Sequence, residues 1–375
     1  MKALIAMSGG VDSSVAAKLT IDKGFECIGC TMKLYNNEDA GVSRLNTCCS
    51  VEDVEDARSV SYKLGMPHYV FNFTDDFREK VIQKFIDSYE KGITPNPCID
   101  CNRYMKFDKL FQRARILGCD YVVTGHYARI EKEGDKFLLK KAVDENKDQS
   151  YVLYSMTQEQ LGHTMFPLGA MHKEETRKIA EANGFLNADK PDSQDICFVP
   201  DGDYAAVIAL HTGKRPQKGD FVDKNGNVLG HHRGIINYTI GQRRGLGLAM
   251  EKPVYVCAIC PKNNTVVVGS NEDLFTREFD ADSFNWISGQ VPAEQFRCKV
   301  KIRYRHPEKW AVVEPVGEGR VHVIFDEPQR AITPGQAAVL YDGDTVLGGG
   351  VIMQSSGGTG VCNGCSASSG ANCKK

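Results

Sequence analysis

The 375-residue chain contains no apolar run close to the roughly 18 residues that a membrane-spanning helix needs. It also has no excess of charge of one sign, because 46 Lys and Arg face 48 Asp and Glu, which leaves a net charge of −2. Any surface that binds nucleic acid must therefore be a local patch. The apolar stretch at residues 1–7 is too short for the core of a signal peptide. We expect a cytoplasmic protein that makes no membrane contact.

Cysteine, by contrast, is abundant. Fourteen cysteines without an export signal indicate thiol or metal chemistry rather than a disulfide scaffold. Two pairs with C-x-x-C spacing, Cys27 with Cys30 and Cys257 with Cys260, lie in strand-like runs, where an offset of three residues points side chains to opposite faces. We expect these four side chains to belong to the core.

The hydrophobic pattern divides the chain into four parts. Residues 1–199 alternate short apolar strands with helices, which predicts an α/β domain with a doubly wound parallel sheet covered on both faces. Residues 200–265 are expected to form a small central domain that contains an Asn-Gly hairpin signal at residues 225–226. Residues 266–354 predict an antiparallel β-barrel. The Gly/Ser/Cys-rich residues 355–375 are expected to be a flexible tail. Strands are expected near residues 4–7, 27–32, 69–71 and 121–124, and helices near 13–24, 51–64, 77–91 and 104–117.

The segment SGGVDSS at residues 8–14 follows the first expected strand and opens the first helix. Glycines let the backbone approach an anion closely, and the unsatisfied N–H groups at a helix start are aligned with its dipole. The segment, which we call the phosphate loop, therefore predicts a phosphate site. It lacks the Gly-Lys-[Ser/Thr] ending of a Walker A loop.

The phosphate loop resembles the PP-loop of ATP pyrophosphatases, which cleave ATP to AMP and pyrophosphate while adenylating a carbonyl oxygen. Further segments narrow the resemblance. In order, they are TPNPCIDCN at residues 94–102, TGHY at 124–127, NKDQSY at 146–151, DSQDICF at 192–198, YTIGQRRGLG at 238–247 and TPGQ at 333–336. These match the bacterial tRNA-specific 2-thiouridylases over nearly the whole chain to about residue 354, and the family installs sulfur at position 2 of the wobble uridine.

The resemblance implies binding sites for three ligands. Asp12 would help hold Mg²⁺ on the pyrophosphate, and the implied ATP-binding residues are Ala6, Met7, Ser8, Gly9, Gly10, Val11, Asp12, Ser13, Met32 and Gly125. Asn96, Pro97 and Cys98 would contact the target base. The other residues implied at the tRNA are His126, Lys147, Asp148, Gln149, Arg303, Tyr304 and Gln336.

Cys101 and Cys197 suit sulfur transfer, because one thiol can carry sulfur as a persulfide while a second attacks it and forms a disulfide. By resemblance Cys101 is the nucleophile and Cys197 the persulfide carrier, supplied by a cysteine desulfurase or a sulfur-relay protein. Cys98 and Cys101 are expected in a loop, and with Cys197 they offer three thiolates, enough for an iron–sulfur cluster. No metal ligand is certain, so both sulfur schemes remain open, and the persulfide relay is favoured because it needs no further cofactor.

The segment at residues 297–305 predicts a tRNA-facing strand. Period-2 alternation puts Cys298, Val300, Ile302 and Tyr304 on one face and five basic residues on the other. Five positive charges without an acid are typical of a phosphate-binding stripe.

Two other functions share some of these features. An amidotransferase-type or argininosuccinate-type ligase has the phosphate loop but needs no paired cysteines. A non-catalytic tRNA-binding or iron-binding protein needs no intact phosphate loop. The favoured function is an ATP-dependent tRNA sulfurtransferase.

Overall fold

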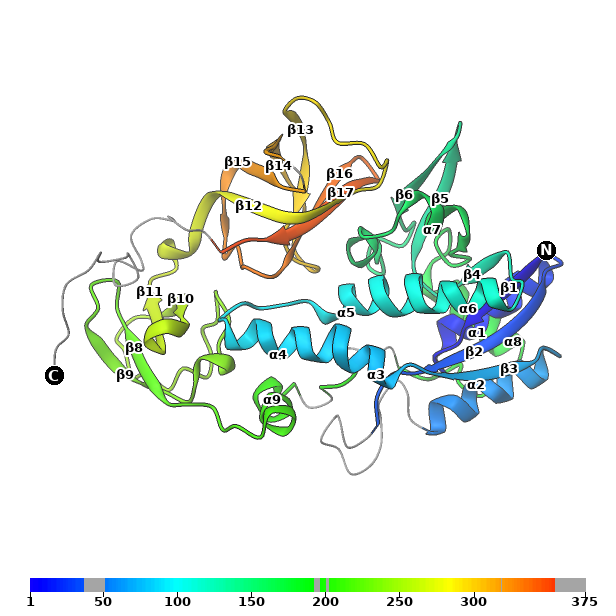
Figure 1. Ribbon diagram of the computed structural model, residues 1–375, viewed down its shortest axis with the longest axis horizontal. Helices are drawn as coiled ribbons and strands as arrows, with labels where there is room; N and C mark the ends of the chain where they lie inside the picture. Colours follow the sequence, from blue (N-terminus) through cyan, green and yellow to red (C-terminus); the bar gives the residue numbers. More distant parts are fainter. Residues whose placement is uncertain (37–50, 192–195, 200–201, 318, 355–375) are drawn as a thin grey trace.

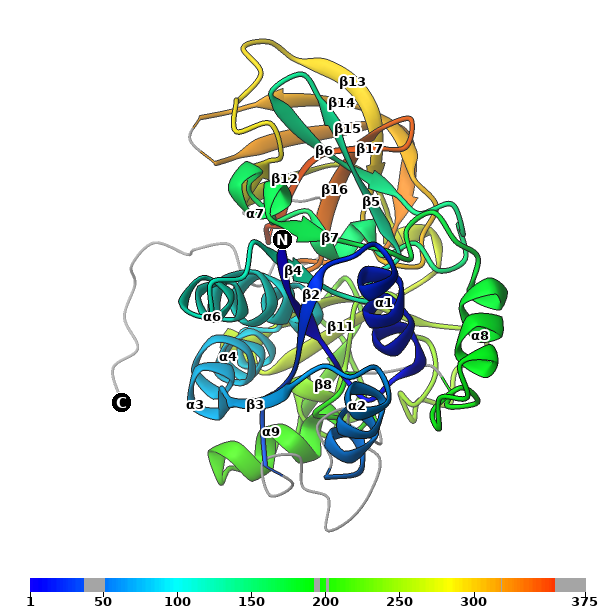
Figure 2. The ribbon, with the colours of Figure 1, turned by 90° about the vertical axis from the view of Figure 1, so that its right-hand side faces the viewer.

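The structure is a computed structural model that describes residues 1–36, 51–191, 196–199, 202–317 and 319–354; the predicted tail lies outside them. A five-stranded parallel sheet organises the N-terminal domain in the order β3 (His68–Asn72), β2 (Glu26–Lys33), β1 (Lys2–Ala6), β4 (Tyr121–Val123) and β7 (Thr164–Met165). One face is covered by α1 (Val11–Asp22), α2 (Val51–Lys63) and α8 (Lys173–Ala182), and the other by the helical segments that follow β3 (Figure 2). The doubly wound sheet is therefore confirmed.

Side-chain alternation along β1 explains the two layers. Ala3 and Ile5 pack with the cluster under α1, α2 and α8, whereas Leu4 between them packs with Leu110 on the opposite face. All three β1 side chains are fully buried, so this strand is apolar on both faces.

Two long helical segments run side by side through the centre of the molecule (Figure 1). The first joins α3 (Thr74–Phe77), a π-helical stretch η2 (Arg78–Ile82) and α4 (Gln83–Glu90). The second joins α5 (Pro97–Asp100), the π-helical stretch η3 (Cys101–Lys109) and α6 (Leu110–Ile116).

The second helical segment begins seven residues earlier than the predicted residue 104. Its N-cap is Asn96, whose side chain accepts a hydrogen bond from the Cys98 backbone N–H at 3.2 Å, and Pro97 occupies the first helical position. The expectation that Cys98 and Cys101 lie in a loop is therefore wrong, because both occupy the opening turns of this helix.

The central domain combines α9 (Tyr204–Thr212) with a four-stranded sheet in the order β10 (Tyr255–Cys260), β11 (Thr265–Gly269), β8 (Gly219–Val222) and β9 (Val228–His232). The expected hairpin joins β8 to β9, with Gly226 at a φ of 86°. β11 pairs with both β10 and β8, so this sheet continues through Gly269, beyond the boundary predicted at residue 265.

The C-terminal domain is a closed antiparallel β-barrel. Its strands follow the order β12 (Phe275–Trp286), β15 (Val321–Arg330), β14 (Lys309–Pro315), β13 (Phe296–Lys301), β16 (Ala337–Asp342) and β17 (Thr345–Ile352), and pairing of β12 with β17 closes it. A hairpin from the N-terminal domain, β5 (Ala128–Glu133) and β6 (Lys136–Lys141), extends this sheet through β17 (Figure 1). The short helices are α7 (Gln158–Gly162), η4 (Ser150–Leu153), η5 (Ile235–Asn237), η6 (Pro261–Asn263) and η7 (Glu272–Leu274).

Within the described residues, no helix combines the length and apolar character required to cross a membrane.

Candidate functional site

The phosphate loop joins β1 to α1 at the carboxyl edge of the parallel sheet, where ligands of such sheets bind. Gly9 has a φ of 75°, and a Cβ there would lie 2.5 Å from the Asp53 carbonyl oxygen, so no larger residue fits. Gly10 is the N-cap of α1 and provides no side-chain cap for the first-turn N–H groups. N–H groups of this kind are suited to bind a phosphate.

Hydroxyl groups fix the shape of the phosphate loop. Ser13 Oγ donates to the Gly10 carbonyl oxygen at 2.9 Å and accepts from the Ser8 backbone N–H at 3.2 Å. Asn187 donates its side-chain N–H to the Gly9 carbonyl oxygen at 2.9 Å and to Ser14 Oγ at 3.0 Å. The loop is therefore held in one conformation by groups on both of its sides.

Gly125 lies directly against the phosphate loop, because a Cβ there would come within 2.8 Å of the Asp12 carbonyl carbon and the Ser13 nitrogen. The structure thus brings Gly125 to the predicted ATP site. Met7 is buried and accepts a hydrogen bond at its sulfur from Ser61 Oγ, and Met32 lies on the neighbouring strand β2 among apolar residues.

Lys173 is a component of this site that the sequence reasoning missed. Its ammonium donates to both carboxylate oxygens of Asp12, at 2.7 and 2.8 Å, and the residue is only 8% exposed. Tyr127, which is also buried, donates to Asp12 Oδ1 at 2.9 Å. The position of Lys173 in the sequence is one signal of this contact, because it is the first residue of α8. A lysine beside the positive end of a helix dipole is unfavourable unless an acid lies nearby.

Folding brings Cys101 and Cys197 to one apolar cluster, although 96 residues separate them in sequence (197 − 101). Both are partly exposed and pack against a core that includes Phe77 and Phe198. The Tyr35 hydroxyl donates to the Cys197 carbonyl oxygen at 2.6 Å and fixes that segment of backbone. Residues 192–195 of the preceding motif lie outside the described residues.

The donor set needed for an iron–sulfur cluster is not assembled. Among the described residues, no three His, Cys, Asp or Glu side chains gather so that they could hold a metal ion. Cys98 is exposed, whereas Cys101 and Cys197 are partly buried against the apolar cluster. As placed, the three thiols do not fit a cluster, and no step of the reaction below uses one.

Three of the four cysteines in the strand pairs, Cys27, Cys30 and Cys260, are buried as predicted. Cys257 is partly exposed, so the expectation that it belongs to the core is wrong; it lies at an irregularity in the pairing of β10. Burial raises the pKa of Cys27 to about 11 and that of Cys257 to about 11, and it raises the pKa of Cys30 still further. Cys30 and Cys260 are buried in β2 and β10. Raised pKa values keep thiols protonated and poorly nucleophilic.

Tyr304, from the barrel, packs against the N-terminal domain, because its ring centre lies 6.0 Å from that of Tyr151 in η4. Partial burial raises the pKa of Tyr304, and the charge of Asp148 raises it further. The Lys301 ammonium lies 5.8 Å from the centre of the Tyr304 ring and 5.9 Å from that of Tyr151. Tyr304, one of the predicted tRNA residues, thus packs against the segment that also carries Asp148.

The predicted basic stripe needs correction. β13 ends at Lys301, so the alternation does not continue to Tyr304, which is 38% exposed. Cys298, Val300 and Ile302 are buried as expected. Two of the five basic residues are paired with acids from other segments: Arg297 bonds Asp326 at 2.5 Å and Lys299 bonds Glu308 at 3.2 Å.

Arg303 joins two domains and does not lie on an open surface. Its guanidinium donates to the Ile240 carbonyl oxygen of the central domain at 3.0 Å and to the Ala331 carbonyl oxygen and the Thr333 hydroxyl of the barrel. Its Nε is buried and has no hydrogen-bond partner. The sequence alone could not reveal this position, because the alternation argument assumed a continuous strand.

Gln336 connects the barrel to the segment just before the cysteine-bearing helix. Its side-chain N–H donates to the Thr94 carbonyl oxygen at 2.8 Å, and the Thr94 N–H donates to the Pro334 carbonyl oxygen at 3.0 Å. We call residues 333–336 the docking turn. The structure thus gives Gln336, expected at the tRNA, a role in holding two domains together.

The remaining expected tRNA residues are His126 and the three residues 147–149. His126 is buried between Phe107 and Phe166, and burial, aided by Lys106, lowers its pKa well below 6.5. Gln149 accepts from the Tyr127 N–H at 2.9 Å. Asp148 accepts from two backbone N–H groups, and Lys147 is partly exposed beside it.

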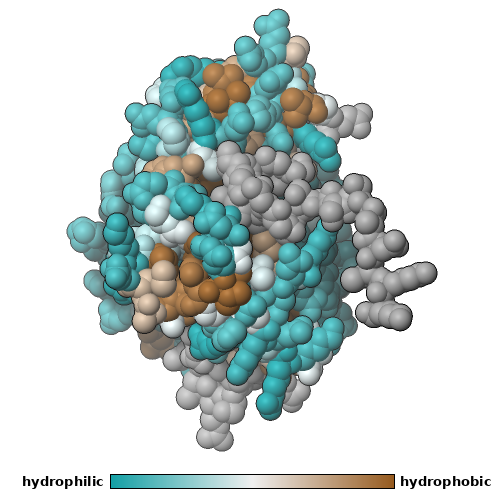
Figure 3. All heavy atoms as spheres, turned by 90° about the vertical axis from the view of Figure 1, so that its left-hand side faces the viewer, coloured by the Kyte–Doolittle hydropathy of each residue, from teal (hydrophilic) through white to brown (hydrophobic). Residues whose placement is uncertain are grey.

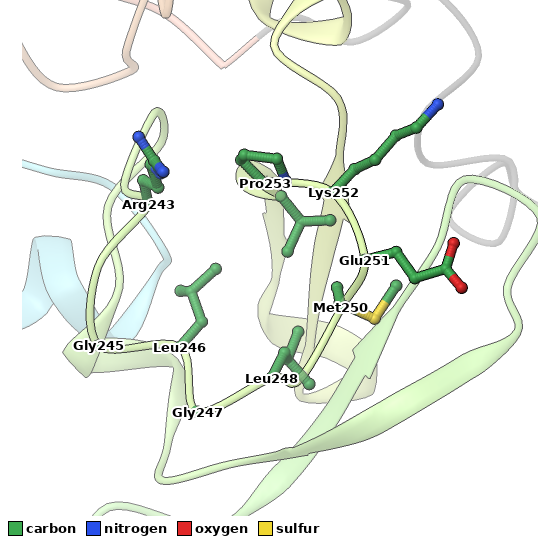
Figure 4. Close-up of a pocket in the computed structure, with 10 residues that line it drawn as sticks. Arg243, Gly245, Leu246, Gly247, Leu248, Met250, Glu251, Lys252 and Pro253 are labelled. Carbon is green, nitrogen blue, oxygen red and sulfur yellow. The ribbon is translucent and has the colours of Figure 1, made fainter.

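A separate pocket of about 380 Å³ lies in the central domain, lined by residues of the YTIGQRRGLG segment and the turn after it. Figure 4 shows Leu246 and Leu248 pointing into it, with Arg243 at one side and Lys252 pointing away. Met250, which also lines the pocket, is 45% exposed. Apolar side chains gather in places on the face of the molecule that Figure 3 shows. The pocket belongs to a different domain from the phosphate loop.

The fold and the site define a nucleotide-dependent α/β enzyme domain joined to two β-domains. Three family models match the chain: a tRNA methyl transferase HUP domain over residues 1–201, a tRNA methyl transferase PRC-barrel domain over 206–270, and an aminomethyltransferase β-barrel domain over 276–352. The tRNA-specific 2-thiouridylase of Clostridioides difficile is 52% identical over 94% of this chain and 98% of its own length, and that of Acetivibrio thermocellus is 51% identical over 94% and 99%.

The chain belongs to the tRNA-specific 2-thiouridylase family. A third relative, from Clostridium botulinum strain Alaska E43, is 48% identical over 94% of this chain and 97% of its own length.

Proposed function

We propose that the chain catalyses ATP-dependent 2-thiolation of the wobble uridine of tRNA. The observation that carries the proposal is that two cysteines 96 residues apart share one cluster in the domain that holds the phosphate loop. The matching domain descriptions mention methyl transfer, whereas the relatives are named for thiolation. A phosphate loop and a cysteine pair are what adenylation and sulfur transfer require, so the site favours thiolation.

The first step activates the uridine. The phosphate loop holds the phosphates of ATP, the uridine O2 attacks the α-phosphorus, and pyrophosphate leaves, which converts the oxygen into a leaving group. The glycine-lined loop with uncapped N–H groups and the Asp12 carboxylate fit a magnesium-bound polyphosphate, since Mg²⁺ is bound through one or two carboxylates plus substrate phosphates. Bound there, the metal would supply charge neutralisation on the phosphates.

The second step transfers sulfur. A sulfur-donor protein loads Cys197 as a persulfide, and its terminal sulfur attacks C2 of the activated uridine, from which AMP leaves. Cys101 then attacks the inner sulfur of Cys197, so the S–S bond of the persulfide breaks and its electron pair stays on the transferred sulfur. The products are 2-thiouridine and a Cys101–Cys197 disulfide, which an external dithiol reduces before the next turnover.

The tRNA binds where the barrel meets the cysteine-bearing helix. At that junction Gln336 bonds Thr94, Tyr304 packs against Tyr151, and Lys301 adds a positive charge beside Tyr304. The target base is turned out of its stack to reach the thiols, as enzymes that modify bases require. Such an enzyme works in the cytoplasm with tRNA and its sulfur donor.

The test is nucleoside analysis of tRNA from cells that lack the gene and carry variants of it. We expect loss of the 2-thio group in the deletion and no recovery with Cys101→Ser or Cys197→Ser. Cys257→Ser is the matched control, because Cys257 is also partly exposed but lies in the central sheet. Retention of the 2-thio group in the deletion would refute the proposal.

Purified protein separates the rival functions. AMP formation that requires tRNA supports the proposed reaction. ATP–pyrophosphate exchange that requires a small carboxylic acid instead would indicate a ligase, and absence of AMP with tRNA and a persulfide donor would indicate a non-catalytic RNA-binding protein.

A further inference from the structure

The phosphate loop contains a charge that should oppose its own ligand. Asp12 lies in the first turn of α1, its side chain is 31% exposed, and it projects from the loop that binds the phosphates. A bare carboxylate in this place would repel a polyphosphate. Magnesium relieves the repulsion once it arrives, but the free protein has to manage the charge by other means.

Lys173 supplies the compensating charge. The Lys173 ammonium lies 2.7 and 2.8 Å from the two oxygens of Asp12, and its side chain is only 10% exposed. Its backbone N–H donates to buried Asp144 at 3.0 Å, which fixes the start of α8 over α1. The ammonium is therefore delivered from a separate helix to the one carboxylate of the phosphate loop.

Neighbouring groups hold the Lys173–Asp12 ion pair in place. The Tyr127 hydroxyl lies 2.9 Å from Asp12 Oδ1 and 3.0 Å from Thr176 Oγ1, and the Lys173 ammonium lies 5.8 Å from the centre of the Tyr127 ring. Both oxygens that a metal would need are thus bonded to groups of the protein. For Asp12 to bind magnesium, Lys173 must release at least one of the two carboxylate oxygens.

We propose that Lys173 is a built-in cation of the polyphosphate site. In the free protein it neutralises Asp12, and when nucleotide-bound magnesium takes the carboxylate, the released ammonium donates to phosphate oxygens of ATP or pyrophosphate. A lysine suits this exchange, because its compact ammonium carries three donors on a flexible stem. The inference rests on the proposed function, since it takes this loop to be the ATP site.

The alternative is that the Lys173–Asp12 ion pair only ties α8 to α1. The binding of inorganic pyrophosphate to the full chain distinguishes this structural role from the proposed one. The measurement is calorimetric affinity, with EDTA and with excess Mg²⁺, together with the melting midpoint of each variant. Lys18→Met is the matched control, because Lys18 also pairs with an aspartate on α1, but on its exposed side.

We expect Lys173→Met to weaken pyrophosphate binding about tenfold in EDTA, which corresponds to about 1.4 kcal/mol, because Asp12 is then not neutralised. It should also weaken binding in Mg²⁺, because the released ammonium is then missing from the phosphates. Lys18→Met should leave both affinities unchanged. Asp12→Asn should tighten binding in EDTA, since the ammonium then faces the phosphates without its partner. Asp12→Asn combined with Lys173→Met should lose that gain, and this variant buries no unpaired charge.

Equal pyrophosphate affinity for the wild type and Lys173→Met, with only a lower melting midpoint, would overturn the proposal and leave a structural tie. The same holds if Asp12→Asn and the double variant bind alike in EDTA. If the wild type binds neither pyrophosphate nor ATP, the proposed function fails first, and the inference fails with it.

Discussion

Replacing Gly335 by alanine should loosen the contact between the barrel and the segment that leads to Cys101, the proposed nucleophile. Gly335 has a φ of 89°, and a Cβ there would lie 2.2 Å from Ile93 Cγ2 and 2.9 Å from the Thr94 carbonyl oxygen. The backbone conformation costs a residue with a Cβ about 1–2 kcal/mol, and the steric overlap adds about 1–3 kcal/mol. We expect a total destabilisation of about 2–5 kcal/mol.

Gly343→Ala is the matched control for this prediction. Gly343 lies in the turn between β16 and β17 at a φ of 57°, and a Cβ there would meet no atom within 4 Å. The Gly343→Ala variant therefore measures only the cost of a positive φ for a residue with a Cβ, about 1–2 kcal/mol. Both tryptophans of the chain, Trp286 and Trp310, lie in barrel strands, so denaturant unfolding followed by tryptophan fluorescence reports on this domain.

The Gly335→Ala variant should unfold at clearly lower denaturant concentration than Gly343→Ala, and it should lose thiolation before it loses pyrophosphate binding. The second effect is expected because the docking turn contacts the segment before α5, whereas the phosphate loop lies at the end of β1. If the two variants unfold at the same midpoint, the contact with Ile93 carries no energy and the reasoning is refuted.

Three further predictions concern chemistry, RNA binding and pH. A single turnover should leave a Cys101–Cys197 disulfide that mass spectrometry detects after proteolysis; recovery of both thiols unoxidised would contradict the relay. Arg305→Ala should reduce the slope of log K, the tRNA-binding constant, against log salt by about 0.7–0.9 without changing the melting midpoint. Arg303→Ala should instead lower the melting midpoint, because Arg303 bonds the central domain. The reverse pattern would contradict the roles given to these two arginines. Burial lowers the pKa of His126 well below 6.5, so the folded protein keeps this side chain neutral while the unfolded chain gains a proton. The free energy of unfolding should therefore fall below about pH 6.5, and His126→Gln should flatten that fall between pH 7 and 5. An unchanged pH profile in the variant would contradict this prediction.

The sequence was a good guide wherever a local pattern decides the structure. The expected strand at residues 27–32 appears as Glu26–Lys33, and the helix expected at 51–64 appears as Val51–Lys63. Apolar runs on both faces of β1 and β2 can be satisfied only inside a covered sheet, so the fold class followed from them. The phosphate loop was equally local, because its glycines and the helix start are adjacent in sequence.

The sequence was a poor guide wherever distant segments decide the role of a residue. The β5–β6 hairpin joins the barrel through β17, about 200 residues later, and nothing in its pattern names that partner. Lys173 and Asp12 are 161 residues apart, and each looks ordinary alone. Arg303 and Gln336 occur in motifs that suggested RNA contacts, yet their hydrogen bonds to Ile240 and Thr94 depend on how the domains meet.

Two of the connections that hold the barrel against the N-terminal domain end near the proposed chemistry. The docking turn bonds Thr94, and Asn96 two residues later caps the helix that carries Cys101. The β5–β6 hairpin begins directly after Tyr127, whose hydroxyl bonds Asp12 in the phosphate loop. A tRNA held by the barrel is therefore held by the same framework that positions the cysteine and the nucleotide site. The thiol must come within a few ångströms of a base that is activated at the phosphate loop. A rigid framework limits the orientations that the bound base can sample, and this restriction itself accelerates the reaction.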